Sequence, residues 1–340
     1  MRRVCFEAFF YRKVDSMLMV RKPIPKALQF SLGIASILLL VGGYTVFSHG
    51  RAVRQKEVAA QQLDNVRNLL SELLATPANE LDPASLAKRQ SKINDYEAQI
   101  TRFEQESQTA FDRTVPTWSS LYHDGLLRVL SPQGLKKDQY WLAEDAWATF
   151  IRLISGLGVG VALSLIIGIL MGAYASIESF FLPPLSFLAK IPPTAMMAIF
   201  FILVGTSFQM YVTMIAFGVL PTLAQSIYQS AKKDVPENLI FKAYTLGASS
   251  LELIWNVIYK QILPRLIDAV RLQIGPAMVM LVAAEWMVSS AGFGYRLRLF
   301  YQRTDMTVIF VYVLILGLAG LVADYLLTLL RRKLCPWFGD

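Results

Sequence analysis

The sequence predicts an all-α, polytopic membrane protein with about six transmembrane helices plus an external helical hairpin. First, 54% of the 340 residues are hydrophobic and 17% are charged, whereas soluble domains have about 45–50% apolar and about 25% charged residues. Second, residues 148–330 contain apolar runs that are each long enough to cross a bilayer. Third, residues 50–112 are polar and carry apolar side chains at helical spacing.

The composition also excludes several functions. The formal net charge is +8, but much of the excess lies at the two ends of the chain, where basic residues orient a membrane protein. The two cysteines, Cys5 and Cys335, give neither a zinc spacing nor a disulfide framework, and only two histidines occur. No G-x-x-x-x-G-K-[ST] motif is found. We therefore expect no nucleic-acid binding and no catalytic, cofactor or metal site in this chain.

Residues 1–27 are basic and are predicted to form a cytoplasmic segment. The apolar run 28–47 has about the 20 residues needed to span hydrocarbon. It is long for the apolar region of a signal peptide, and no clear A-x-A cleavage site follows it, so an uncleaved first transmembrane helix is favoured. With the basic end in the cytoplasm, residues 48–147 are expected in the periplasm.

Within this periplasmic segment, residues 50–112 predict two amphipathic helices that form an antiparallel hairpin. Thr76-Pro77 and Asp82-Pro83 separate the helices, and a cap residue followed by proline is typical of a helix start. Two interpretations remain open, a docking surface for a partner or a self-contained hairpin without a ligand. Residues 113–146 carry aromatic side chains among charges and are predicted to be interfacial.

Five further spans follow from the later apolar runs. Together with the first helix they return the carboxyl end, with its basic tail at 331–340, to the cytoplasm. One loop fits poorly, because Arg296, Arg298 and Arg303 fall on the predicted outer side. Either that loop folds into the interface or the topology differs there. The five predicted spans are residues 148–174, 181–205, 208–229, 267–288 and 306–330.

The first of these five spans has a small residue at every fourth position. This spacing aligns the small side chains on one helix face, where the backbone of a neighbouring helix can approach closely. A dinucleotide-binding loop is the alternative for the glycines, but no strand precedes them. We therefore predict a helix-packing stripe made of Gly156, Gly160, Ser164, Gly168 and Gly172.

The second of the five spans is interrupted at Pro192-Pro193. Proline removes a backbone donor, and irregular backbone inside a membrane survives only where protein or a water-filled cavity covers it. Pro192, Pro193 and Thr194 are therefore candidates for the translocation pathway, with a simple packing kink as the alternative. Glu285 is a further candidate, because an acid in an apolar run is costly without a cavity or partner. Ion pairing or helix capping is its alternative, and is favoured for Asp324.

Residues 235–265 are too polar to cross a bilayer and too patterned for a slack loop, so we expect a folded cytoplasmic loop. Pro236-Glu237 begins a short helix, with the acid near the positive helix end. Gly247 permits a sharp turn that a side chain would hinder. A second helix resumes after the turn, and Pro264 is predicted to end it.

The run A-Y-T-L-G-A-S from Ala243 to Ser249, followed by Ile262-Leu263-Pro264, resembles the EAA loop of permease subunits of bacterial ABC importers. The resemblance extends over about residues 117–330. Phe241-Lys242-Ala243 stands where the family has E-A-A, so the acid is missing. Further segments resemble motifs of the nitrate/sulfonate/taurine branch in the same order: Ile191-Pro192-Pro193, Ala284-Glu285, Ala291-Gly292-Phe293-Gly294-Tyr295 and Thr304-Asp305.

This resemblance implies a permease subunit of an ATP-driven importer in the bacterial inner membrane, with both termini cytoplasmic. It implies a homodimer, two cytoplasmic ATPase subunits that carry ATP and Mg, and a periplasmic solute-binding protein. The implied substrate is a small oxyanion such as nitrate, a sulfonate or taurine. The residues that it assigns to ATPase coupling are Glu237, Lys242, Ala243, Leu246, Gly247, Ala248, Leu263 and Pro264. Because the acid of the E-A-A motif is missing, Glu237 and Lys242 are expected to make an altered contact with the ATPase.

Two other functions remain open from the residues alone. A gradient-driven secondary transporter needs a paired charge system within the membrane and often contains internal repeats, and we find no convincing repeat. A membrane-anchored scaffold that acts through the external hairpin has no need for Gly247.

Overall fold

The structure is a computed structural model that describes residues 25–75, 83–109, 114–133 and 138–338. The chain divides into two compact units, with the boundary in the sequence between Trp118 and Ser119. In the described ranges, helices make up nearly all of the regular structure, and one isolated bridge joins Gln133 to Gln139. The predicted all-α class is therefore confirmed.

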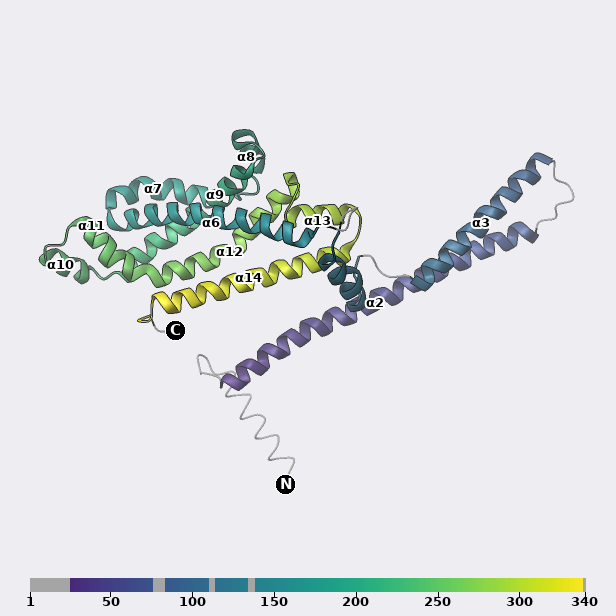
Figure 1. The fold of residues 1–340 in the computed structure, drawn as a ribbon, viewed down its shortest axis with the longest axis horizontal. Coiled ribbons are helices and arrows are strands. Elements are labelled where there is room, and N and C mark those ends of the chain that lie inside the picture. Colours follow the sequence, from purple (N-terminus) through teal and green to yellow (C-terminus); the bar gives the residue numbers. More distant parts are fainter. Residues whose placement is uncertain (1–24, 76–82, 110–113, 134–137, 339–340) are drawn as a thin grey trace, which may run out of the picture. The chain divides into compact units, whose positions relative to one another are not determined.

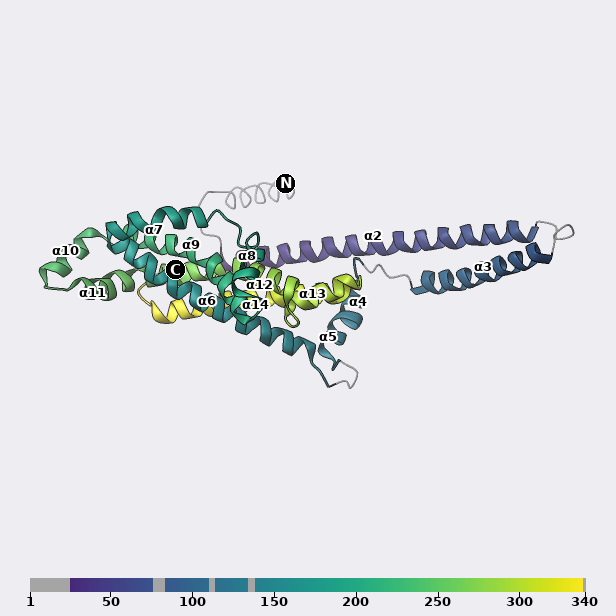
Figure 2. The same ribbon diagram turned by 90° about the horizontal axis from the view of Figure 1, so that it is seen from above.

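The first unit consists of α2 (Lys26–Ala75) and α3 (Pro83–Thr109), which lie side by side in Figures 1 and 2. An ion pair between Arg67 and Glu104 joins them, with Nη2 and Oε1 2.6 Å apart. α2 runs through the predicted border between the first span and the hairpin, since no proline interrupts it there. The predicted break at residues 76–82 lies outside the described residues.

The amino-terminal part of α2 is apolar and exposed. Phe30, Leu39 and Leu40 each have more than two thirds of their side chain accessible. This part of α2 is one of five helices in the described residues that are long and apolar enough to cross a membrane. The division of the chain at residue 47 stays a prediction.

The second unit is a bundle of long helices joined by shorter ones (Figure 1). The long helices are α6 (Trp141–Ala173), α9 (Phe208–Asp234), α12 (Lys260–Val288) and α14 (Met306–Leu334). The shorter elements are α4 (Trp118–Ser120), the π-helical turn η1 (Leu121–Leu127), α5 (Arg128–Leu130), α7 (Ala175–Leu188), α8 (Met197–Val204), α10 (Glu237–Thr245), α11 (Ser250–Leu253), the π-helical turn η2 (Ile254–Tyr259) and α13 (Phe293–Gln302).

The predicted span over residues 181–205 is not one helix, and its predicted interruption at Pro192-Pro193 is present. The segment instead contains the end of α7, a stretch without α-helix at residues 189–196, and the short helix α8. Pro192-Pro193 removes two successive N–H donors and disfavours helical backbone at the preceding residue, which explains the break. Five helices of spanning length are therefore described, where about six were expected.

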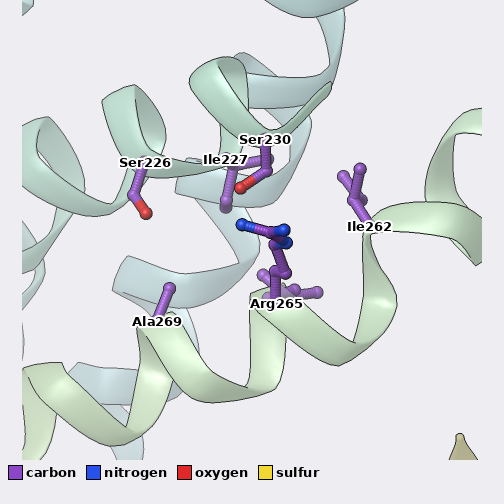
Figure 3. Close-up of a pocket in the computed structure, with 7 residues that line it drawn as sticks. Ser226, Ile227, Ser230, Ile262, Arg265 and Ala269 are labelled. Carbon is purple, nitrogen blue, oxygen red and sulfur yellow. The ribbon is translucent and has the colours of Figure 1, made fainter. Parts of the chain in front are cut away.

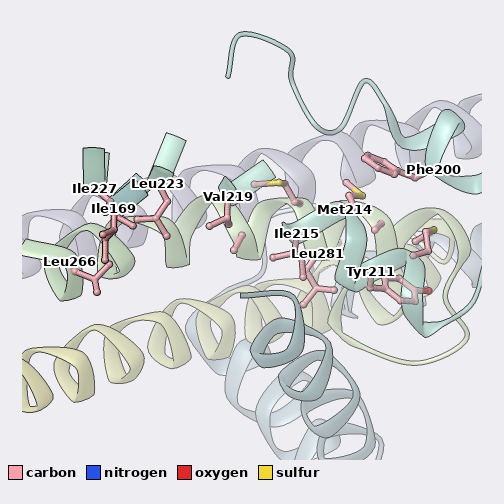
Figure 4. Packing of buried hydrophobic residues seen from close by; sticks show 14 of the residues in the cluster. Ile169, Phe200, Tyr211, Met214, Ile215, Val219, Leu223, Ile227, Leu266 and Leu281 are labelled. Carbon is pink, nitrogen blue, oxygen red and sulfur yellow. The ribbon is translucent and has the colours of Figure 1, made fainter. Parts of the chain in front are cut away.

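The core of the second unit lies between α6, α9 and α12. α9 supplies the largest set of fully buried side chains, and more than half of the residues in its most apolar stretch are buried. Figure 4 shows these side chains meeting Ile169 of α6 and Leu266 and Leu281 of α12. The buried α9 residues at the centre of the core are Met210, Tyr211, Met214, Ile215, Val219, Leu223 and Ile227.

The small-residue stripe of α6 faces α9. A Cβ atom placed on Gly156 would lie 2.6 Å from the Cβ of Ile215, and one on Gly168 would lie 2.7 Å from the Cβ of Ile227. The hydroxyl of Ser164 donates to the carbonyl of Gly160 at 2.7 Å, within its own helix. The missing side chains thus allow α6 and α9 to approach closely along their length.

This contact predicts different effects for two glycines of α6. Gly168→Ala would press its Cβ against the Ala224 carbonyl (2.8 Å) as well as Ile227, so we expect a loss of about 1–3 kcal/mol in the free energy of unfolding. Gly158 has no atom within 4 Å of an added Cβ, so Gly158→Ala should be neutral or gain up to about 1 kcal/mol from helix propensity. Unfolding in detergent micelles measures both, and equal effects would contradict the packing.

Candidate functional site

The loop of residues 235–265, here called the coupling loop, begins with α10. Pro236 directly precedes the helix with φ −67° and ψ 138°, and Glu237 lies in the first turn. Proline has no N–H to leave unpaired at a helix start, and an acid there complements the helix dipole. The short helix predicted at this place is therefore present.

α10 ends in a tight turn that explains several residues of the EAA-like motif. Ala248 N donates to Ala243 O at 3.0 Å, and Gly247 N donates to Tyr244 O at 2.9 Å. Gly247 has φ +82°. These features define a Schellman motif, which satisfies the last carbonyls of the helix and needs glycine at the left-handed position. Ala243, Gly247 and Ala248 therefore set the backbone geometry of the loop.

The next helix begins with a capping box. Ser249 N donates to Glu252 Oε2 at 2.9 Å, and Glu252 N donates to Ser249 Oγ at 3.4 Å. Such reciprocal bonds satisfy two backbone donors at once and fix where α11 starts. The turn between the two helices is thus held on both sides, by the Schellman motif before it and the capping box after it.

The prediction that Pro264 ends the second helix is wrong. After α11 the helix continues through η2 into α12, and Pro264 is buried inside α12. Membrane helices tolerate internal proline because neighbouring helices and local π-helical adjustments satisfy the freed carbonyl groups. Here η2 ends one turn before Pro264, and the flanking residues Ile262 and Leu266 pack into the core against α9. The coupling loop is therefore continuous with a long core helix.

The predicted coupling residues lie in two different environments. Glu237, Lys242, Leu246 and Gly247 are exposed, and 88% of the Leu246 surface is accessible. Leu263 and Pro264 pack in the core instead. The exposed part of the loop also carries large apolar side chains that the sequence reasoning did not single out, namely Phe241, Tyr244, Leu251 and Trp255. Apolar side chains gathered on an exposed knob are typical of a protein-binding surface.

An ion pair closes the base of the coupling loop. Asp234, the last residue of α9, lies 2.9 Å from Nε of Arg265 near the start of α12. Figure 3 shows the Arg265 side chain pointing from α12 toward Ser230 of α9. Because the pair is half exposed, its contribution to stability is small. It nevertheless joins the end of α9 to the start of α12, the two helices that the loop connects.

A second cluster of polar residues is buried between α6, α12 and α13. Glu285 of α12 is fully buried, and its Oε1 lies 2.7 Å from Nη1 of Arg152. The Thr149 hydroxyl donates to the same carboxylate at 2.9 Å, and Gly294 N donates to it at 3.0 Å. The guanidinium of Arg152 also lies 4.3 Å from the centre of the Tyr211 ring. Glu285 is therefore an ion-paired structural residue here, which is the alternative weighed from the sequence.

A second carboxylate joins α13 to α6 in the same way. Asp145 is fully buried and accepts from Arg296 Nε at 2.6 Å, from Gly292 N at 2.8 Å and from the Tyr312 hydroxyl at 3.1 Å. The Arg296 guanidinium also lies over the Trp141 ring, 4.4 Å from its centre. We call Asp145, Thr149, Arg152, Glu285, Arg296 and Tyr312 the carboxylate network.

The carboxylate network explains the glycine motif before α13. Gly292 has φ +117°, and a Cβ there would lie 2.5 Å from Glu285 Oε1. A Cβ on Gly294 would lie 2.6 Å from the Cβ of Glu285. Two buried carboxylates can bind these backbone N–H groups only if both positions are glycine.

The arginine-rich loop is also accounted for. It forms α13, in which Arg296 is buried in the network, while Arg298 donates to the carbonyls of Met287 (2.9 Å) and Ser289 (3.1 Å). The loop therefore folds onto the helix bundle. Whether it lies in the membrane interface or the topology differs there stays a prediction.

Residues 188–193 line a cavity of about 360 Å³ together with parts of α9 and α12. Pro192 and Pro193 contribute to its wall, whereas Thr194 and Glu285 do not. Of the four pathway candidates, two therefore lie at a cavity. Their role in translocation stays a prediction.

Asp324 pairs with Arg271 through two bonds of 2.8 and 2.9 Å, so the favoured ion-pair interpretation of Asp324 is confirmed. The carboxylate network members other than Glu285 were missed. The sequence could have indicated two of them, since Asp145 and Arg152 are charged residues at the start of a long apolar run, where a charge needs a partner. Periodicity alone does not reveal partners that are more than 130 residues away.

The fold and these sites define a polytopic helical protein of the membrane type, with a folded loop between two helices of spanning length. Residues 160–335, more than half of the chain, match the family described as binding-protein-dependent transport system inner membrane component. The chain belongs to this family, and it is therefore a permease subunit of an ABC importer for small solutes rather than an enzyme. The resemblance seen in the sequence is confirmed, and membership implies an ATPase and a solute-binding protein as partners.

Three relatives and a solved structure agree with this assignment. A protein of Brucella melitensis named as a probable ABC transporter permease is 31% identical over 196 residues, which are 58% of this chain and 79% of the relative. The taurine transport permease TauC of Escherichia coli is 25% identical over 63% of this chain and 77% of its own. The bicarbonate transport permease CmpB of Synechocystis is 24% identical over 65% of this chain and 80% of its own. A solved structure of the methionine ABC transporter MetNI in an inward-facing conformation shares the fold with a TM-score of 0.50 and 18% identity. The match covers 57% of this chain and 96% of the MetNI chain.

The burial of Glu285 predicts a large effect of removing its carboxylate. Glu285→Ala leaves Arg152, which is largely buried, without a counter-charge, so we expect a loss of about 3–5 kcal/mol in the free energy of unfolding. Asp324→Ala is the matched control, because its pair with Arg271 is partly exposed and should contribute only about 0–1 kcal/mol. Unfolding in detergent micelles measures both variants. Similar losses for the two would show that burial does not distinguish the pairs.

Proposed function

We propose that the chain forms, as a homodimer, the translocation pathway of an importer for a small oxyanion, and that residues 235–265 transmit the motion of a separate ATPase. The observation that carries this proposal is the coupling loop itself. It presents exposed apolar side chains on a turn that is fixed by a Schellman motif and a capping box. A rigid apolar knob is suited to a groove on a partner protein.

The charge distribution supports a cytoplasmic position for the coupling loop and both termini. α9 ends with Lys232 and Lys233 beside the loop, and α14 ends with Arg331, Arg332 and Lys333. Basic residues at the ends of spans favour the cytoplasmic side of the bacterial inner membrane. A solute-binding protein would then dock at the opposite, periplasmic side.

A homodimer is supported by a polar residue that the chain leaves uncovered at mid-depth. Thr222, near the middle of α9, is exposed. A polar surface in the middle of a spanning helix is stable only where protein or water covers it. A second copy of the chain would cover it and enclose a pathway between the two copies.

In this mechanism ATP and Mg bind to the partner ATPase, and this chain responds mechanically. Closure of the two ATPase subunits would displace both coupling loops, and each loop would move the long helix α12 that continues from it. Alternation between inward-open and outward-open states then follows from the different affinity of the ATPase for each state.

The substrate class rests on relatives. TauC is described as a taurine transport permease, and CmpB as a bicarbonate transport permease. Both solutes carry a small oxyanion group, so we propose a substrate of this class, which includes nitrate and sulfonates.

Gly247→Val tests the coupling loop. Valine at φ +82° is strained by about 1–3 kcal/mol, which deforms the turn that presents Leu246. We expect at least about a fivefold loss of ATPase co-purification and of stimulated ATP turnover. Gly205→Val is the matched control, because Gly205 has φ +79° and equally open surroundings but lies after α8. This control should keep ATPase association.

Normal ATPase association and uptake in the Gly247→Val variant would overturn the coupling role. An equal loss in the Gly205→Val variant would assign the effect to general misfolding instead. Uptake that persists without any ATPase would favour a gradient-driven transporter.

A further inference from the structure

The cavity beside Pro192-Pro193 has an unusual lining. Its wall combines mostly apolar residues with three polar ones from three separate segments, Lys190 after α7, Thr222 of α9 and Gln273 of α12. Among the described residues that line it there is one cation and no acid. A volume of about 360 Å³ falls in the range of small-molecule sites, about 300–1,000 Å³.

Lys190 differs from three arginines of the helix bundle. Arg152, Arg271 and Arg296 each pair with a buried or half-buried carboxylate. Within the described part of the chain, the Lys190 ammonium has no ion-pair or hydrogen-bond partner. An unpaired cation inside a membrane domain is costly, and it is expected only where it faces a cavity or binds something.

The polar residues of the cavity lie near the middle of the spanning helices. Thr222 is 14 residues from the start of α9 and 12 from its end, which correspond to about 21 and about 18 Å of helix. Gln273 is 13 residues from the start of α12 and 15 from its end, or about 20 and about 22 Å. This depth is remote from lipid headgroups at either surface.

The two neutral residues leave donors for an anion. The Thr222 hydroxyl donates to Gln273 Oε1 at 3.4 Å and to Val219 O at 3.2 Å. Gln273 therefore uses its oxygen as an acceptor, and its NH₂ group has no partner among the described residues. An ammonium and an amide NH₂ group are both donors, and together they suit the oxygens of a small anion.

We propose that Lys190, Thr222 and Gln273 form a binding site at mid-depth for the anionic group of the transported solute. The proposal rests on the proposed importer function and names a residue, Lys190, that selects for negative charge. Pro192 and Pro193 hold Lys190 in this position, because the helix ends before it and the non-helical segment presents it to the cavity. The proposed ligand group is a sulfonate, carboxylate, nitrate or bicarbonate.

The local charge can be measured by thiol labelling, without a transport assay. Thr222→Cys is placed in a Cys5→Ser, Cys335→Ser background in phosphatidylcholine nanodiscs. It is labelled with an anionic and a cationic methanethiosulfonate reagent of similar size. We expect Lys190→Gln to lower the ratio of anionic to cationic labelling rates by about tenfold, because removing a unit charge from the cavity wall weakens the attraction of the anionic reagent and the repulsion of the cationic one.

Ser179→Cys provides the matched control, because Ser179 is exposed on α7 and does not line the cavity. Its rate ratio should be unchanged by Lys190→Gln. Gln273→Cys gives an independent reporter if Thr222→Cys fails to fold. An unchanged ratio at both cavity positions would overturn the proposal.

Protection from labelling identifies the ligand. Taurine, bicarbonate or nitrate should slow the labelling of Thr222→Cys when Lys190 is present and not in the Lys190→Gln background. Protection only by added phosphatidylglycerol would show a lipid headgroup site and overturn the assignment to the solute, as would protection by none of these anions.

The two proposals can fail separately. If Gly247→Val keeps ATPase association, the importer coupling is wrong whatever the labelling shows. If the Gly247→Val variant loses ATPase association while Lys190→Gln leaves the labelling ratio unchanged, only the proposed anion site is wrong.

Discussion

The close contact between α6 and α9 is the constraint on which the rest of the second unit depends. Gly156, Gly160 and Gly168 leave space that Ile215, Ala216 and Ile227 occupy, so the two helices pack with little side chain between them. Lipid tails are as apolar as leucine, so helices in a membrane associate by such packing rather than by the hydrophobic effect. Once α9 is fixed in this way, its other faces can position α12 and the residue that begins the coupling loop.

Charge in this bundle divides into two kinds. Asp145 and Glu285 are buried, yet each is bonded to a guanidinium and to a backbone N–H, so the cost of burial is offset. They fix the position of α13 against α6 and α12. Lys190 shows the opposite pattern, with a cavity and no counter-charge. The comparison separates charges that hold the structure from a charge that is available to a ligand.

Much of this architecture could be predicted from the sequence. Apolar runs located α6, α9, α12 and α14, and the turn chemistry at Gly247 located the coupling loop, because both signals are local. The helix end predicted at Pro264 was wrong. Pro264 lies inside α12, where its neighbours Ile262 and Leu266 pack against α9, and no local pattern contains that packing. The carboxylate network was missed for the same reason, since Asp145 and Arg296 are paired only by tertiary structure.

The continuity of α12 changes how the coupling loop would act. A helix that ended at Pro264 would let the loop pivot independently of the membrane helices. Instead, α12 runs from Lys260 past Gln273 to Glu285, so its first turn and the Lys190 cavity lie on one element, about 20 Å apart. The carboxylate network fixes the far end of the same helix. In the proposed mechanism, a displacement of the loop would be transmitted to the cavity along this helix. The π-helical turn η2, where the backbone hydrogen bonding changes, would be the place where the helix adjusts.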